Sequence, residues 1–555
     1  MISERTFFIR PKRPSVWLAS TLLFSVMLAH AGCFLNAKVE PYYGRVTVPR
    51  NQEFRWSDGG LPQTFDPAYA AAPPDTDLVR AIFEGLTDYD PQTLKALPGV
   101  AARWEPSNGG RVWTFYLRPN ARWTNGETVT ASDFVRSWNR TVKIGELSPH
   151  TELLSNIDGA AEAISESVLR VRLRRPDLNF PALVAHPVFR PVKLKDGEGV
   201  GKLPASGLVS NGAFSLAPGE TQRVLLERAS SYWDKDQVTL ERVEFVDQKN
   251  SEAALDAYRN GTIDAVTNAA LEPLAIKLLK PYEDFRRTTY GALTYYTFNK
   301  AQAPFDDVRV REALALAIDR DRISSDDLHG ATEPAKRFLP DAVNEAAKPV
   351  VGKSELLEQD VLRAKELLAE AGFPDGDGFP RIRLLINRNE QQRTVAQSVA
   401  AMWRSALNVE TEIIVKNWDE YEVAIREGDF DVVRRGVVIQ TTDELTNISM
   451  IFHNHATSAT TDASRAQKNG NDPLARNGPA VSPSESAAKS MLPETEAQAL
   501  SDLAAMPIYF ASSYALVKPY VTGFDSNVLD APSLKTVRIN TAWRPSESPD
   551  MVKGK

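Results

Sequence analysis

The sequence predicts an α/β protein with mixed sheets, and three observations lead to this prediction. Segments with apolar residues at helical spacing alternate with strand-like segments along most of the chain. No short repeat interrupts the alternation, which argues against a solenoid. The chain has 555 residues, 43% of them hydrophobic and 25% charged. That composition is globular, and the length allows about two to four domains.

In the first half of the chain, capping residues and apolar spacing predict each element in turn. Asp75 is a suitable N-cap for a helix over 75–90, and Leu78 and Ile82 have helical spacing in it. Strict alternation over 167–176 predicts a half-buried strand. The same patterns predict further strands at 53–57, 112–118, 223–233 and 240–248 and a helix at 129–142.

In the second half, long helices and short strands continue to alternate. The segment 306–323 is strongly amphipathic and predicts a single helix, and a second helix over 360–373 is stopped by Gly372. The remaining elements are predicted as a strand at 381–387, a helix at 394–407, a strand at 409–418 and a final strand that begins near residue 506.

One segment, residues 456–490, breaks the pattern. It has no aromatic residue, almost no aliphatic ones, and many Ser, Ala, Asn and Pro residues. Such a segment buries too little apolar surface to offset an ordering entropy of about 1–2 kcal/mol per residue. We predict disorder there.

The N-terminus predicts export. Arg5, Arg10, Lys12 and Arg13 precede an apolar, uncharged run from Val16 to Ala29. That run is shorter than the roughly 18 residues that span a bilayer. A basic start, a short apolar run and small residues after it are typical of a secretory signal over residues 1–33, followed by a linker over 34–53. The alternative is an uncleaved membrane anchor.

Cys33 is the only cysteine, so no intramolecular disulfide forms. Two processing sites compete around it. Ala29-His30-Ala31 fits ordinary signal cleavage, whereas Ala31-Gly32-Cys33 resembles the end of a bacterial lipobox, although His30 stands where a leucine is usual. We favour lipidation of Cys33, which predicts a periplasmic protein tethered to the membrane.

The composition and motifs exclude several functions. A net charge of -7, with Lys and Arg spread along the chain, argues against nucleic-acid binding. There is no G-x-S-x-G elbow, P-loop or G-x-G-x-x-G, and only six histidines. His453 and His455 have alternate spacing but no Cys, His or acidic cluster beside them, so no metal site is predicted. We predict no enzyme and no cofactor, with a hydrolase as the alternative.

Four long stretches, in order, resemble one family. They are FEGLTDYDP with the following PGVAARWEPSNGGRVWTFYLRPNARWTNGETVTASDFVRSW, SNGAFSLAPGETQRVLLERASSYWD, YYTFNKAQAPFDDVRVREALALAIDRDRI and AMPIYFASSYALVKPYVTGF. Over about 54–445 and 500–545, the chain is similar to family 5 solute-binding proteins, the oligopeptide- and dipeptide-binding components of ABC importers.

The resemblance implies a periplasmic-binding-protein type II-like fold, with two lobes joined by hinge strands and an inserted domain. Lobe I would combine 54–88, 206–297 and 506–545, the inserted domain would be 89–205, and lobe II would be 298–505. Ligand would be enclosed as the lobes close.

The resemblance also implies a function. The protein would bind short peptides as a monomer between the lobes and deliver them to membrane permease and ATPase subunits. Alternatives are the same fold binding a nickel chelate, an opine or an oligosaccharide, or a degenerate sensor that no longer transports.

In this family, peptides are held mainly by backbone hydrogen bonds, like a strand added to a sheet edge. Gly436 to Gln440 match a Gly-Trp-x-x-Asp segment whose aspartate binds the ligand's amino group, and here Val437 and Gln440 replace the Trp and the Asp. A neutral amide forms no charge-assisted bond to an ammonium group, so binding of a free N-terminus is in doubt. Asp443 or Glu444 would substitute if the loop is shifted; otherwise they face solvent.

The resemblance carries further residues into the predicted site. Arg434 matches an arginine at the pocket edge and would contact the ligand or its carboxylate, with a structural ion pair as the alternative; strand alternation points Arg435 the other way. Pro62, which has no N–H, weakens pairing of its loop with an extended peptide. The remaining predicted ligand residues, each with core packing or a structural role as the alternative, are Gln63, Tyr295, Tyr296, Asn299, Asn387, Gln392 and Trp418.

Overall fold

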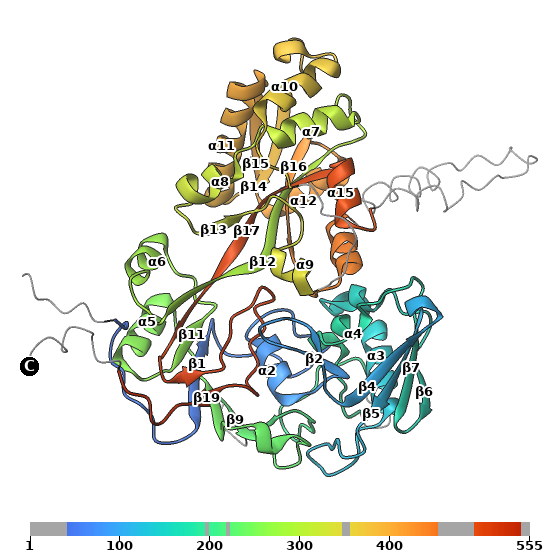
Figure 1. Ribbon diagram of the computed structural model, residues 1–555, viewed down its shortest axis with the longest axis vertical. Coiled ribbons are helices and arrows are strands. Elements are labelled where there is room, and N and C mark those ends of the chain that lie inside the picture. Colours follow the sequence, from blue (N-terminus) through green and yellow to red (C-terminus); the bar gives the residue numbers. More distant parts are fainter. Residues whose placement is uncertain (1–40, 195–198, 218–222, 347–355, 453–492, 546–555) are drawn as a thin grey trace, which may run out of the picture.

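The computed structural model describes residues 41–194, 199–217, 223–346, 356–452 and 493–545. The predicted signal, Cys33 and the low-complexity segment 456–490 therefore lie outside the described residues. Two long antiparallel strands, β12 (Phe285–Phe298) and β17 (Ala505–Val517), run from a lower part to an upper part of the molecule (Figure 1). They lie side by side in one large sheet with the order β15-β14-β16-β12-β17-β11-β1-β10-β9-β8, and β13 also pairs with β17.

The lower part contains one half of this main sheet. Its strand β1 pairs in parallel with β10 and β11, whereas β9 pairs with β10 and β8 with β9 in antiparallel fashion. The strands are β1 (Glu53–Asp58), β8 (Phe214–Leu216), β9 (Val224–Arg228), β10 (Arg242–Phe245) and β11 (Ala265–Thr267). The helices are α2 (Asp75–Ile82), α5 (Ser251–Asn260) and α6 (Pro273–Leu279).

A separate antiparallel sheet with the order β4-β5-β7-β6 also belongs to the lower part. Helix α3 (Ala131–Ile144) begins with a capping box between Thr130 and Asp133, and it contacts β6 and β7. The strands are β4 (Ala101–Ser107), β5 (Val112–Leu117), β6 (Glu162–Ser165) and β7 (Val168–Arg172). Short elements complete this part: β2 (Thr87–Tyr89), β3 (Ala96–Pro98), α4 (Phe180–Leu183), β18 (Val521–Thr522) and β19 (Arg538–Ile539).

The upper part holds the other half of the main sheet, where β14 pairs in parallel with both β15 and β16. Helices provide the crossovers that parallel strands need. The succession is β14 (Ile382–Asn387), α11 (Glu390–Leu407), β15 (Thr411–Lys416), α12 (Trp418–Glu427) and β16 (Val432–Val438). The other elements are α7 (Val308–Leu316), α8 (Arg320–Arg322), β13 (Thr332–Pro334), α9 (Asp341–Ala346), α10 (Val361–Glu370) and α15 (Glu496–Asp502).

The predicted α/β class with mixed sheets is confirmed, but two predicted helices were wrong in extent. The helix over 75–90 ends at Ile82, because Phe83 is extended and Thr87–Tyr89 pairs with β3. The single helix predicted over 306–323 is divided into α7 and α8, because the backbone is extended at Asp319. The Asp319 side chain is the N-cap of α8 and accepts a hydrogen bond from the Arg322 N–H. The division into three numbered domains stays a prediction.

Two of the stretches that carry the family resemblance meet at Glu84. Its carboxylate is buried and accepts hydrogen bonds from the Tyr232 hydroxyl and from Trp233 Nε1, at 2.6 Å for the latter. Lys535 Nζ lies 3.2 Å from the same carboxylate. The Glu84 backbone exchanges two hydrogen bonds with the Asn211 side chain. These residues therefore hold α2, the chain before β10 and the C-terminal segment together.

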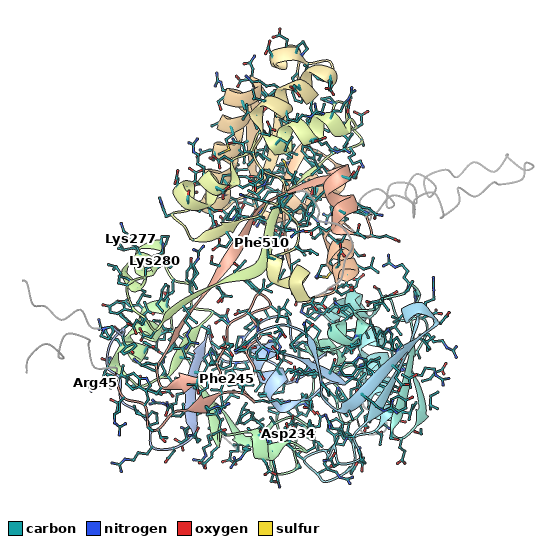
Figure 2. The ribbon with its side chains drawn as sticks, in the orientation of Figure 1. Arg45, Asp234, Phe245, Lys277, Lys280 and Phe510 are labelled. Atoms are coloured by element: carbon teal, nitrogen blue, oxygen red, sulfur yellow. The ribbon has the colours of Figure 1, made fainter. Side chains whose placement is uncertain are left out.

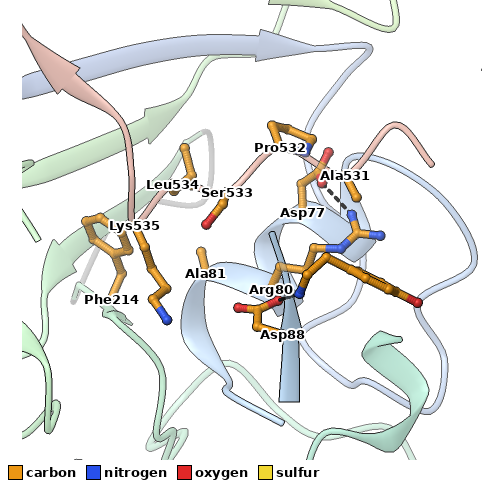
Figure 3. A pocket seen from close by; sticks show the side chains of 11 residues that line it. Asp77, Arg80, Ala81, Asp88, Phe214, Ala531, Pro532, Ser533, Leu534 and Lys535 are labelled. Carbon is orange, nitrogen blue, oxygen red and sulfur yellow. Dashed lines mark hydrogen bonds and ion pairs between the residues drawn. The ribbon is translucent and has the colours of Figure 1, made fainter. Parts of the chain in front are cut away.

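A small cavity lies beside this network, between α2 and the C-terminal segment (Figure 3). Its volume is about 20 Å³, and Asp77, Arg80, Asp88 and Lys535 contribute its charged side chains. Such a space holds about one water molecule. Ligand sites are at least about 300 Å³ in volume, so this cavity is not where a peptide binds.

Candidate functional site

The carboxyl ends of the parallel strands β14, β15 and β16 gather polar side chains in the upper part. In open α/β sheets, ligands bind outside this end of the strands. Asn387 ends β14, Trp418 begins α12 directly after β15, and Arg434 lies within β16. Because the crossover helices make these strands parallel, the three predicted residues lie toward the same end of the sheet.

Arg434 and Arg435 lie on opposite faces of the sheet. Arg434 pairs in register with Tyr296 of β12, and Arg435 with Tyr295, and neighbours on paired strands share a face. Arg434 Nη2 lies 3.3 Å from Thr294 Oγ1 on its own face. The site residues named from the sequence are thus divided between the two sides of the β12–β16 pair.

The face of Arg434 contains a buried group of polar atoms around Tyr509. Gln392 Nε2 donates to the Tyr509 hydroxyl at 2.8 Å, and Gln391 Nε2 donates to it at 3.0 Å. Tyr296 is fully buried, and burial, with Tyr509 nearby, raises the pKa of its hydroxyl. Three atoms here have no hydrogen-bond partner among the described residues: the Tyr296 hydroxyl, Gln392 Oε1 and Arg434 Nε. Buried polar atoms rarely stay unpaired, which makes this group of atoms a candidate for contact with a ligand or with water.

Gly436 allows the Arg434 guanidinium to lie across the strand. A Cβ atom at position 436 would stand 3.1 Å from Arg434 Nη2. Gly436 itself is exposed. A side chain at this position would therefore displace the guanidinium.

The face of Arg435 is more apolar. The Tyr295 hydroxyl is buried and donates to the carbonyl of Ile451 at 3.2 Å. The Trp418 ring is 58% exposed and lies 5.6 Å from the Tyr421 ring. The Tyr421 hydroxyl donates to the backbone carbonyl of Arg434, which the sequence did not indicate. Asn387 Oδ1 is buried without a partner among the described residues.

β16 presents a free edge beyond Val433. The Asn299 N–H donates to the carbonyl of Asp431, and the Ile439 N–H donates to the carbonyl of Gly291. In an antiparallel pair every second residue bonds to the partner strand, so these two bonds determine which residues of β16 face β12. By that alternation, the backbone N–H and C=O groups of Gly436 and Val438 point away from β12. β14 pairs with β16 only at Val432 and Val433, so in the described part of the chain these groups have no strand partner.

Three other predicted residues have local structural contacts. The Asn299 side chain donates to the carbonyls of Gly428 and Phe430, each at 3.1 Å, and thereby holds the turn before β16. The Gln63 N–H donates to Asp75 Oδ1 at 2.6 Å, and Pro62 is buried. The loop after β1 therefore offers an extended peptide fewer free donors than its position suggests.

The loop 439–443, which we call the junction loop, forms hydrogen bonds with residues 177–186, which lie outside the upper part. Gln440 Oε1 lies 3.3 Å from His186 Nε2, and Asn179 Nδ2 donates to the carbonyl of Thr442 at 3.0 Å. Burial and the nearby His150 lower the pKa of His186 well below its usual value, so its imidazole is neutral. Gln440 and His186, both uncharged, thus lie where the family resemblance implies an amine-binding aspartate.

The acids considered as substitutes are already engaged. Asp443 is buried, and its carboxylate accepts the Thr446 N–H at 2.7 Å at the start of a helical segment, residues 444–452. Burial, together with the nearby Asp443 carboxyl, raises the pKa of Asp177. Glu444 Oε1 accepts the Glu496 N–H at 2.7 Å. His186 and Asp177 are far from this loop in sequence, and no sequence motif marked them.

Comparison with known proteins decides the family. The family model described as "Bacterial extracellular solute-binding proteins, family 5 Middle" matches residues 95–459. The oligopeptide-binding protein OppA of Escherichia coli K12 is 30% identical over 502 residues, 86% of this chain and 91% of that protein. The chain belongs to family 5 of the bacterial extracellular solute-binding proteins. It is therefore a solute-binding protein of ABC transport and not an enzyme.

Family 5 relatives differ in the ligands their names record. The periplasmic murein peptide-binding protein MppA of E. coli is 33% identical over 422 residues, 71% of this chain and 76% of that protein. The probable deoxycholate-binding periplasmic protein YgiS of E. coli is 28% identical over 525 residues, 91% of this chain and 96% of that protein. These relatives are named periplasmic. No helix in the described ranges is both long and apolar enough to cross a bilayer.

Solved family 5 structures show the same fold. The unliganded open form of MppA superposes with a TM-score of 0.72 at 28% identity, covering 89% of this chain and 98% of that one. A structure of the Escherichia coli murein tripeptide binding protein MppA gives a TM-score of 0.60, also at 28% identity. Haemophilus influenzae OppA in complex with the peptide RPPGFSPFR gives 0.60 at 26% identity, covering 89% of this chain and all of that one.

Proposed function

We propose that this family 5 protein binds short peptides between its upper and lower parts and delivers them to the permease and ATPase subunits of an importer. The free edge of β16 at Gly436 and Val438 is the observation that carries the proposal. Paired N–H and C=O groups on an open edge fit an extended peptide backbone, which adds as a further strand. β12 and β17 would act as the hinge between the lobes predicted at 54–88 with 206–297 and 506–545, and at 298–505.

In this proposal, Arg434 holds the carboxylate end or an acidic side chain of the peptide. Its guanidinium lies over Gly436, and the unpartnered hydroxyl of Tyr296 and amide oxygen of Gln392 lie on the same face. The Gln392 oxygen and a carboxylate would be bridged by water, since both accept hydrogen bonds. Trp418, exposed beside Tyr421, would pack against a ligand side chain.

Native mass spectrometry of the protein purified from its own host tests the ligand class. A mixture of short peptides is expected, since backbone recognition selects little for sequence. A single non-peptide mass would contradict the proposal and favour a ligand such as a bile acid, a metal chelate or a sugar oligomer.

Arg434→Ala should weaken peptide binding about 10- to 100-fold, because a hydrogen bond to a charged group contributes about 1.5–3 kcal/mol. Arg381→Ala is the matched control, since this exposed arginine lies before the amino end of β14, away from the proposed site. Isothermal titration calorimetry measures both, and circular dichroism checks the fold. Unchanged affinity in Arg434→Ala would show that this face is not the ligand site.

Acetylating the peptide's N-terminus should change affinity by less than about threefold. Gln440 and neutral His186 supply no negative charge, so an ammonium group gains no charge-assisted bond there. Titration of one peptide in free and acetylated forms makes the measurement. A loss of a hundredfold or more on acetylation would mean that an acid, with Asp443 the nearest, receives the amino group.

A further inference from the structure

The outer face of helix α6 carries an apolar surface that no part of the described chain covers. Ile276 and Leu279 are buried and hold the helix to the lower part. Leu274 and Leu278, one turn apart on the opposite side, are 67% and 64% exposed. Two large exposed aliphatic side chains on one helical turn are more than the scattered single ones that a surface normally shows.

Basic residues accompany these leucines. Lys277 lies between them in sequence and Lys280 follows, both exposed, and Figure 2 shows both lysines at the outer edge of the molecule beside α6. Glu272, the acid nearest in sequence, lies before the helix begins. Although the formal net charge is -7, charges more than about 10 Å away are largely screened, so the local lysines decide attraction to a charged surface.

The described chain begins at the same corner of the molecule. Glu283 N–H, shortly after α6, donates to the carbonyl of Pro41 at 2.9 Å, and Tyr43 N–H donates to Asp284 Oδ1 at 2.8 Å. The Tyr43 ring also lies 5.3 Å from the ring of Tyr282. Pro41 is therefore fixed next to α6, and residues 34–40 span at most about 25 Å when fully extended. A chain tethered at or before Cys33 thus keeps α6 close to the membrane.

We propose that the face of α6 formed by Leu274, Lys277 and Leu278 lies on the surface of an anionic lipid bilayer. Leucines that enter the headgroup boundary, with lysines directed to anionic lipids, are the combination by which interfacial helices bind membranes. The contact orients the protein with α6 toward the bilayer. It uses none of the residues proposed for peptide binding, so the two proposals stand or fall separately.

Hydrogen–deuterium exchange of the full chain, as its host processes it, tests this contact. Amides of residues 272–280 should exchange at least about threefold more slowly with vesicles of phosphatidylglycerol and phosphatidylethanolamine than without vesicles. Leu274→Gln combined with Leu278→Gln should abolish the protection. Leu362→Gln, on α10 and 77% exposed, is the matched control and should keep it. A tether alone cannot protect α6, because the anchor lies outside this helix.

Two results would overturn the proposal. One is exchange over 272–280 that is the same with and without lipid. The other is protection that appears only when the vesicles also contain the permease, which would assign this face to a protein partner. Peptide affinity is measured in parallel and should be unchanged in the double variant, so that failure of the lipid contact is distinguished from failure of the binding function.

Discussion

Glu84→Ala is expected to lower the free energy of unfolding by about 3–5 kcal/mol, because it removes a buried carboxylate that forms an ion pair with the half-buried Lys535 and accepts hydrogen bonds from Tyr232 and Trp233. Lys535 Nζ, 3.2 Å from the carboxylate, would lose that partner, and Trp233 Nε1 would lose an acceptor at 2.6 Å. A buried donor left unpaired adds its own desolvation cost. Urea denaturation followed by circular dichroism measures the change.

Two further variants separate the lost ion pair from other effects of the substitution. Lys535→Met in the Glu84→Ala background should recover part of the stability, because the unpaired ammonium group is removed. Glu146→Ala replaces an exposed glutamate and should change stability by less than about 0.5 kcal/mol. If Glu84→Ala were as stable as Glu146→Ala, the hydrogen bonds around Glu84 would not be what holds residues 83–91 and 210–234 together.

Local patterns of apolar residues predicted the position of many strands. Strict alternation over 167–176 corresponds to β7 at Val168–Arg172, and 381–387 corresponds to β14 at Ile382–Asn387. Helix ends were less well predicted. The apolar residues Phe83 and Leu86 continue the helical spacing past Ile82, yet both are buried in an extended segment. Spacing alone does not distinguish a buried helix end from a buried extended chain.

The site was predictable only where one strand supplied it. Alternation within β16 separates Arg434 from Arg435, and register with Tyr296 and Tyr295 places them on opposite faces. The other contacts depend on tertiary structure. Tyr509 reaches Gln392 from a strand more than a hundred residues away, and His186 reaches Gln440 from outside the upper part. No local pattern encodes such pairs, so sequence reasoning left them out.

Raising the pH from 6 to 8 is expected to destabilise the protein by about 2 kcal/mol through Asp177. Burial, together with the facing Asp443 carboxylate, raises the pKa of Asp177 to about 8. An unfolded aspartate titrates near 4. Between these values the folded state holds a proton that the unfolded state lacks, so stability falls as pH rises, at a rate that cannot exceed about 1.4 kcal/mol per pH unit.

Other groups titrate near this window and set its limits. His186 has a lowered pKa, so the unfolded state binds the extra proton below about pH 6.5, and its contribution makes stability rise with pH there. Burial and the nearby Asp58 raise the pKa of Asp530 to about 6, so this group is mostly ionised above pH 7. Burial lowers the pKa of Lys518 to about 8, which affects stability mainly above pH 8. Burial and the nearby Asp58 also raise the pKa of Asp77 well above its usual value, so the contribution of Asp177 is obtained as the difference between the wild type and a variant that lacks this group.

Asp177→Asn removes this titrating group and should make the loss of stability between pH 6.5 and 8 smaller by about 1.5 kcal/mol. Asp158→Asn, an exposed aspartate elsewhere in the segment 89–205, should keep the wild-type pH dependence. Urea unfolding at several pH values gives the slope for each protein. If the wild type and Asp177→Asn lost stability in parallel, Asp177 would already be ionised at pH 6.5. Because Asp443 belongs to the junction loop with Gln440, ionisation of Asp177 would add repulsion between this loop and residues 177–186 and should loosen the loop beside the proposed peptide site.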